Sequence, residues 1–112
     1  MKCDHNKKIK IMADYSTKGL WCGECGGHID PIILMTYRNV RITMSLSDKL
    51  KEFNDYFEEN ADYISPVGCQ APDPIPSFID TLNDLGRIIE KELQKLNPNF
   101  EVYYHPYTYA ER

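Results

Sequence analysis

The chain of 112 residues is 42% hydrophobic and 27% charged, a balance that excludes a disordered chain and fits one globular domain spanning residues 1–112. Its 17 acidic residues outnumber 13 basic ones, and the net charge of -4 argues against direct nucleic-acid binding, which needs a surplus of Lys and Arg. No apolar run approaches the ~20 residues of a membrane span, and the polar N-terminus has no signal-peptide core, so we expect a cytoplasmic protein.

The first predicted element is a strand at residues 8–13, in which polar and apolar residues alternate before the run becomes apolar. Residues 14–31 are rich in Gly, Ser, Thr and Cys and predict a long loop, and loops of this length in small domains usually have a function. Residues 32–44 are β-rich and predict two short extended segments that meet in a turn at residues 37–39.

The next predicted elements are an amphipathic helix and a connection. The helix is predicted to begin with Ser45 or Ser47 as its cap and to end near Asp62. Apolar residues repeat at spacings of three and four, which places on one face Leu50, Phe53, Phe57, Ala61 and Ile64. Residues 65–76 contain four prolines and predict a rigid surface connection, because proline cannot continue the helix.

A second amphipathic helix is predicted to begin at Ser77, because Ser77 and Asp80 resemble a capping box, and to end before Pro98. Its buried face would hold Phe78, Leu82, Leu85, Ile89, Leu93 and Leu96. Residues 100–104 are β-rich and predict the last strand. The expected fold class is therefore α/β of the α+β type: a small sheet that includes the first and last strands, covered on one face by the two helices.

Residues 21–25, Trp-Cys-Gly-Glu-Cys, nearly spell the active-site pentapeptide of a thioredoxin. Such a site needs a buried strand before it and a helix that begins at the first cysteine, whose dipole makes the thiol more acidic. The sequence predicts neither, because polar and small residues precede Trp21, and two glycines and a proline follow Cys25. We therefore do not expect thioredoxin chemistry.

A small redox or zinc-binding protein is the alternative interpretation, because Cys22, Cys25 and His28 have the spacing of metal ligands. A fourth ligand would have to come from a distant residue: Cys3, His5 or Cys69. No second CxxC accompanies the first one, so we favour the interpretation that both cysteines are ordinary loop residues and that no cofactor is needed.

Four residues of the same loop, Asp14, Tyr15, His28 and Asp30, could form an acid–base group. Asp before Pro is also a common turn opener, and Asp after a strand commonly caps a loop, so structural roles are favoured. The chain also has no phosphate-cradling glycine loop and no nucleophile elbow, and we do not expect an enzyme.

The strongest interaction signal is an acidic face on the first predicted helix, opposite its apolar face. Like charges three or four residues apart repel one another, and a basic partner would relieve the repulsion and be steered to this surface. Lys49 and Lys51 are placed on the flanks. The predicted partner-binding residues are Asp48, Glu52, Asp55, Glu59 and Asp62, with Tyr56 and Tyr63 beside them as aromatic anchors.

Short motifs along most of the chain resemble a group of small bacterial proteins that open with a MADY…LW…GxIDP pattern. The matching segments are Met12-Ala13-Asp14-Tyr15, Leu20-Trp21, Gly27-His28-Ile29-Asp30-Pro31, Ser47 with Leu50, and Glu101-Val102-Tyr103-Tyr104. The chain departs from the pattern by inserting residues 33–44 and by its two loop cysteines. The resemblance implies a compact α/β protein without a catalytic residue, and it implies an immunity protein of the kind found beside contact-dependent growth-inhibition toxins.

These observations predict a cytoplasmic immunity protein that occludes the active surface of a cognate toxin, such as a basic nuclease domain. The acidic carboxylates would then occupy the groove that normally holds phosphates. Trp21 and Ile29 are expected to pin the glycine-rich loop to the core.

Overall fold

The computed structural model describes residues 8–14, 17–64 and 75–107. Its elements follow the order β1 (Lys8–Ile11), β2 (Leu20–Cys22), α1 (Pro31–Tyr37), α2 (Met44–Glu59), α3 (Ala61–Ile64), α4 (Pro76–Leu96) and β3 (Glu101–Tyr104). None of the helices in these ranges combines the length and the apolar character that a membrane span requires.

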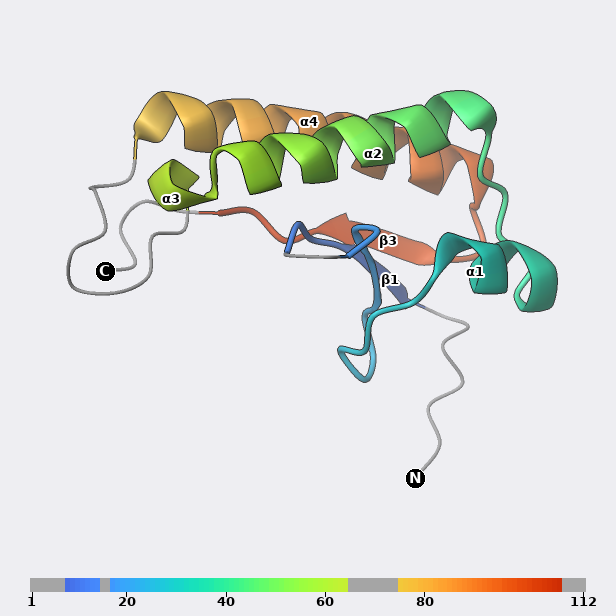
Figure 1. The fold of residues 1–112 in the computed structure, drawn as a ribbon. Helices are drawn as coiled ribbons and strands as arrows, with labels where there is room; N and C mark the ends of the chain where they lie inside the picture. Colours follow the sequence, from blue (N-terminus) through green and yellow to red (C-terminus); the bar gives the residue numbers. More distant parts are fainter. Residues whose placement is uncertain (1–7, 15–16, 65–74, 108–112) are drawn as a thin grey trace.

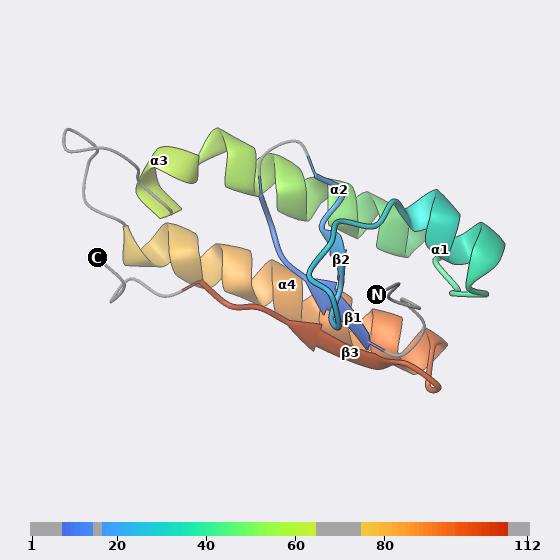
Figure 2. The ribbon, with the colours of Figure 1, turned by 90° about the horizontal axis from the view of Figure 1, so that it is seen from below.

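A three-stranded mixed sheet lies beneath α2 and α4, with β1 and β3 under α4 (Figures 1 and 2). The strand order is β2-β1-β3, in which β1 pairs antiparallel with β2 and parallel with β3. Ile9 faces Cys22 on one side and Val102 on the other, and all three are buried against the helices. The prediction that the first and last strands pair, with helices on one face of the sheet, is confirmed.

The predicted long loop at residues 14–31 is wrong in part, because it contains β2. Gly19, with a φ of 85°, turns the chain into this strand, and Leu20 and Cys22 are fully buried. Trp21 forms an isolated bridge with His28, so the loop folds back on itself as an irregular hairpin. Because β2 has only three residues, it is too short to show a recognisable alternation of polar and apolar residues in the sequence.

The predicted extended segments at residues 32–44 are wrong, because residues 31–37 form α1. The Asp30 carboxylate accepts a hydrogen bond from the Ile32 backbone N–H at 2.8 Å, and Pro31 occupies the first helical turn. Both are strong local signals for a helix start and outweigh the β preference of the isoleucines that follow. The helix ends near the predicted turn, where Asn39 has a φ of 56°.

The predicted first helix is present as α2, but its cap and its end differ from the prediction. Thr43 is the cap, since its hydroxyl accepts a hydrogen bond from the Leu46 N–H at 3.1 Å, and Ser45 and Ser47 lie inside the helix. The helix stops at Glu59, and α3 follows as a separate short helix. The predicted apolar face is confirmed as buried: Leu50, Phe53, Phe57, Ala61 and Ile64.

The predicted second helix is present as α4 and ends at Leu96, as expected. The predicted capping box is wrong, because Ile75 is the cap residue and makes no side-chain cap bond, while Pro76 at the first turn has no N–H to satisfy. Of the predicted buried face, Leu82, Ile89 and Leu93 are buried and Phe78, Leu85 and Leu96 are partly buried. The predicted connection falls mainly on residues 65–74, outside the described residues.

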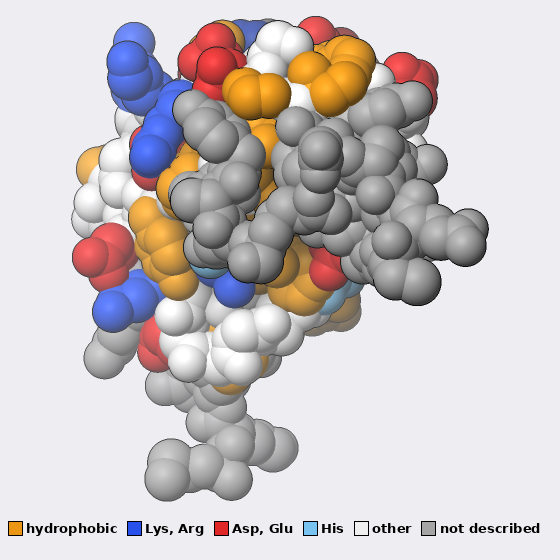
Figure 3. Space-filling model, turned by 90° about the vertical axis from the view of Figure 1, so that its left-hand side faces the viewer, with side chains coloured by type: hydrophobic (Ala, Val, Ile, Leu, Met, Phe, Trp, Pro, Cys, Tyr) orange, Lys and Arg blue, Asp and Glu red, His pale blue; other side chains and the backbone are white. Residues whose placement is uncertain are grey.

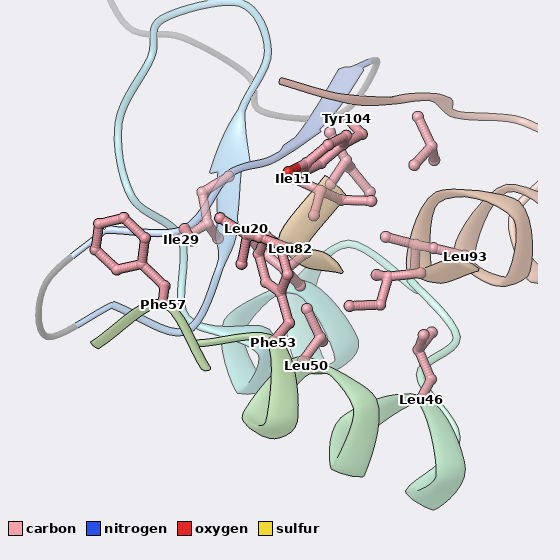
Figure 4. Packing of buried hydrophobic residues seen from close by; sticks show 14 of the residues in the cluster. Ile11, Leu20, Ile29, Leu46, Leu50, Phe53, Phe57, Leu82, Leu93 and Tyr104 are labelled. Carbon is pink, nitrogen blue, oxygen red and sulfur yellow. The ribbon is translucent and has the colours of Figure 1, made fainter. Parts of the chain in front are cut away.

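The core fills the space between the sheet and the helices, where Ile11 and Leu20 point toward Phe53 of α2 (Figure 4). The Phe53 and Tyr104 rings meet edge to face, with 5.8 Å between their centroids. Tyr104 is held from α4 as well, because its hydroxyl donates to the Asn83 Oδ1 at 2.6 Å. Burial, then the nearby Tyr107 hydroxyl, raises the pKa of Tyr104 above its usual range, and Arg87 opposes this shift.

Because of this raised pKa, the free energy of unfolding should decrease at alkaline pH. The unfolded chain loses the tyrosine proton first, near pH 10, so the contribution of neutral Tyr104 is complete below about pH 10 and is lost as pH rises further. In Tyr104→Phe we expect a loss of about 1 kcal/mol near neutral pH, because a hydrogen bond disappears, and a shallower alkaline decline. Urea unfolding at about pH 8 and about pH 11 measures both effects. A group that is protonated in the folded state and deprotonated in the unfolded state changes the free energy of unfolding by about 1.4 kcal/mol per pH unit. Parallel declines in the two proteins would contradict the prediction.

Candidate partner-binding surface

Five of the seven predicted partner-binding residues line one shallow depression on the outer side of α2. Asp48, Glu52, Asp55, Tyr56 and Glu59 surround it, together with Lys51, and its volume is about 400 Å³. Three of the carboxylates are exposed, and Asp55 and Tyr56 are half-buried. Asp62 and Tyr63 are in α3, but their side chains lie outside the described part of the structure.

The predicted placement of the lysines on the flanks of the acidic face is confirmed for Lys49 and wrong for Lys51. Lys51 lies in the depression, where its ammonium donates to the Asp55 carboxylate at 2.7 Å. This hydrogen bond, and then the charge of Asp55, raise the pKa of Lys51. Lys49 turns away from the depression and pairs with Glu92 of α4. The depression thus holds four carboxylates and one ammonium and stays negative.

The remaining carboxylates of the depression are available to a partner. Within the described residues, no ion pair involves Asp48, Glu52 or Glu59. Asp48 and Glu52 are four residues apart on the helix, and so are Asp55 and Glu59, so these pairs repel by a few tenths of a kcal/mol each. A cation from a partner would therefore meet three carboxylates that form no ion pair with the described residues.

A second groove, missed at the sequence level, continues the depression toward α1. It shares Lys51 and Asp55 with the depression, and its remaining lining comes from two sides: Thr17, Lys18 and Pro31 on one, and Ser47, Leu50, Asn54 and Glu58 of α2 on the other. Asn54 is buried at 6% exposure, and its Oδ1 accepts no hydrogen bond within the described residues. The two hollows form one continuous surface along α2.

The other end of the acidic face, near Glu59, runs toward the side of the molecule that Figure 3 shows. That side carries hydrophobic, acidic and basic side chains together, around residues that the structure does not describe. The carboxylates concentrate instead along the length of α2.

The cysteine loop does not bring together a metal site in the described residues. No group of three His, Cys, Asp or Glu side chains there could hold a metal ion. Cys22 is buried, and its Sγ accepts hydrogen bonds from the N–H groups of Glu24 and Cys25 at 3.3 Å each. The His28 Nε2 accepts from the Lys18 N–H at 3.0 Å. The candidate fourth ligands Cys3, His5 and Cys69 fall outside the described residues.

The thioredoxin comparison is corrected in one respect, because a strand does lead to the motif: Cys22 is the last residue of β2. No helix begins there, since residues 23–25 form a turn and Gly26 has a φ of 78°. No disulfide joins Cys22 and Cys25. The helix N-terminus that would activate the first thiol is therefore missing at this position.

Of the residues weighed as an acid–base group, Asp30 and His28 make structural side-chain contacts. Asp30 caps α1, and the Asp14 carbonyl accepts from the Thr17 hydroxyl at 3.1 Å. Tyr15 lies outside the described residues. The expectation that Trp21 and Ile29 pin the loop to the core is confirmed for Ile29, which is 7% exposed and belongs to the core. It is wrong for Trp21, which pairs with Lys10 outside the core and holds the loop through its indole N–H, a donor to the Met12 carbonyl at 2.9 Å.

Comparison with known proteins agrees with the resemblance seen in the sequence. No curated protein is similar enough to count as a match. The family model described as Serratia CdiI immunity protein-like matches residues 7–107, which include all of the described helices and strands. The chain therefore belongs to the Serratia CdiI immunity protein-like family.

Proposed function

We propose that this protein is a cytoplasmic immunity protein that binds its cognate contact-dependent growth-inhibition toxin and occludes the toxin's active surface. Membership in an immunity-protein family supports the class of function. The acidic depression on α2 supports the mode of binding, because its unpaired carboxylates and Tyr56 are the kind of surface that attracts and anchors a basic partner.

The partner of this surface is a toxin domain with a basic active groove, and a nuclease fits this description. A nuclease groove binds phosphates through Lys and Arg, and the carboxylates of α2 would take the place of those phosphates. The protein needs no chemistry of its own for this role, since it acts by covering the toxin. The observation that carries the proposal is the cluster of Asp48, Glu52, Asp55 and Glu59 in one depression.

The proposal predicts a complex with nanomolar affinity that weakens with salt. The cognate toxin domain would be purified and titrated with the immunity protein by calorimetry across about 0.05 to 0.5 M salt. Salt screens the charges that steer the two proteins together, so association should become slower as salt rises. Dissociation should change little. A tight complex that salt does not affect would contradict the acidic face as the binding surface.

A functional assay extends this test to the toxin's active surface. If the toxin is a nuclease, the complex should not cleave nucleic acid, and a short DNA or RNA duplex should compete with the immunity protein for the toxin. A complex that binds tightly but leaves cleavage unchanged would show that the protein covers another surface.

A further inference from the structure

An exposed apolar surface surrounds α1 and the start of α2. Among the large hydrophobic residues of the described chain, seven are exposed, and five of them lie between residues 32 and 44. Tyr37 is 74% exposed and Met44 is 82% exposed, and the others are Ile32, Ile33 and Met35. Single exposed hydrophobic residues are normal on a protein surface, but a group of this kind marks an interaction site.

The exposed side chains of α1 do not hold the helix in place. Leu34 is its one buried side chain, and the helix is fixed at its ends by the Asp30 cap and by the Val40 N–H, which donates to the Leu34 carbonyl at 3.2 Å. A seven-residue helix has little stability of its own in water. Ile32 and Ile33 are 66% and 49% exposed, so much of their apolar surface is left uncovered by the fold, and a partner would cover it.

The apolar surface adjoins the acidic depression, because Met44 lies one helical turn before Asp48 on α2. Figure 1 shows α1 below the start of α2, and Figure 2 shows the two helices overlapping there. The groove between them runs from Pro31, at the start of α1, to Lys51 and Asp55, which also line the depression. One partner seated over α2 would therefore reach α1.

The acidic depression is too small to form a stable interface alone. A typical interface buries about 800 Å² on each partner and is formed by about 20 residues or more from each side. Its energetic centre is usually a few desolvated aromatic and apolar side chains, whereas exposed charges add mainly to the rate of association. Tyr56 is the one described aromatic residue in the depression, and it is half-buried there.

We propose that α1 and Met44 form the apolar anchor of the interface with the toxin, an inference that rests on the proposed function. The occupant is an apolar pocket on the toxin, next to the basic groove that α2 covers. The two parts of the surface then have separate kinetic roles. The carboxylates of α2 determine how fast the complex forms, and the side chains of α1 determine how long it lasts.

The test measures association and dissociation rates of the purified toxin domain with Tyr37→Ala and Met44→Ala. Both side chains are mostly exposed, so the variants should unfold at the wild-type temperature. We expect each variant to dissociate about tenfold faster, with unchanged association and an unchanged salt dependence. Ile88→Ala is the matched control, because Ile88 is an exposed hydrophobic residue on α4, and it should behave as the wild type does.

The outcomes separate this inference from the proposed function. Wild-type dissociation rates in both Tyr37→Ala and Met44→Ala, with a salt-sensitive complex, would overturn the anchor and leave the acidic face in place. Failure of the wild-type protein to bind the toxin would overturn both. Sedimentation of the protein alone tests whether a second copy of the chain covers α1 instead. A dimer that becomes a monomer in Tyr37→Ala would show that α1 binds a second copy, and would overturn the anchor.

Discussion

Gly86→Ala should destabilise the protein by about 3 kcal/mol, although alanine is the better helix former by about 1 kcal/mol. Gly86 is buried in the middle of α4, where β3 crosses the helix. A methyl group there would lie 2.2 Å from the Tyr104 Cε1 and 2.5 Å from its Cζ. The ring cannot move freely, because its hydroxyl is bound to Asn83 and its edge meets Phe53.

Thermal and urea unfolding measure this loss, which should lower the melting temperature by about 10 °C for a domain of this size. Gly27→Ala is the matched control, because a methyl group at that exposed position would meet only the Cys25 Sγ, at 3.5 Å. It should change stability by less than about 0.5 kcal/mol. If Gly86→Ala were as stable as the control, β3 could not pack as closely on α4 as the structure shows.

Reversal of three charges on α2, in the triple variant Asp48→Lys, Glu52→Lys and Glu59→Lys, should weaken toxin binding at least about a hundredfold. Three cations would then face a basic surface, and like charges across an interface cost several kcal/mol. These carboxylates are exposed and take part in no ion pair among the described residues, so the fold should be unaffected. Asp55 is left unchanged because it binds Lys51.

Stopped-flow kinetics should place most of this loss in the association rate, and the remaining binding should no longer weaken with salt. The control reverses three acidic residues elsewhere, Asp80, Asp84 and Glu101, and produces the same change in net charge. Glu101 loses an ion pair with Lys8, but this pair is exposed and contributes little to stability. It should bind nearly as the wild type does, apart from a small long-range effect. Equal losses in both triple variants would mean that net charge, and not the α2 surface, attracts the toxin.

The helices and strands that could be predicted are those whose apolar residues recur at a regular spacing along the sequence. The apolar spacing of Leu50, Phe53 and Phe57 indicates one buried helix face, and the alternation at residues 8–11 and 101–104 indicates strands. The fold class followed from these patterns. The short elements could not be found in this way, because β2 has three residues and the two isoleucines that open α1 look like a strand. The signal that was available for α1 was the pair Asp30-Pro31, a cap followed by a proline at the first helical position.

The candidate surface was predictable in outline, because outward positions on an amphipathic helix can be counted. The depression formed by five of the predicted residues agrees with this reasoning. The position of Lys51 could not be predicted, since a long side chain on the flank can bend toward a carboxylate one turn away. The groove to α1 depends on contacts between residues 17–18 and α2, which no local pattern reports.

The pairing of β1 with β3 joins two parts of the chain that are far apart in sequence. Ile9 of the central strand is in register with Val102 of its parallel neighbour, about 90 residues further along the chain. Until this pairing forms, one edge of β1 is unpaired, and Gly86 of α4 lacks the Tyr104 ring that packs against it. Long-range pairing of this kind is slow to form, because the chain must close a large loop before the contact stabilises it. Under the proposed function, the protein would therefore be ready to bind its toxin only after β3 has joined the sheet.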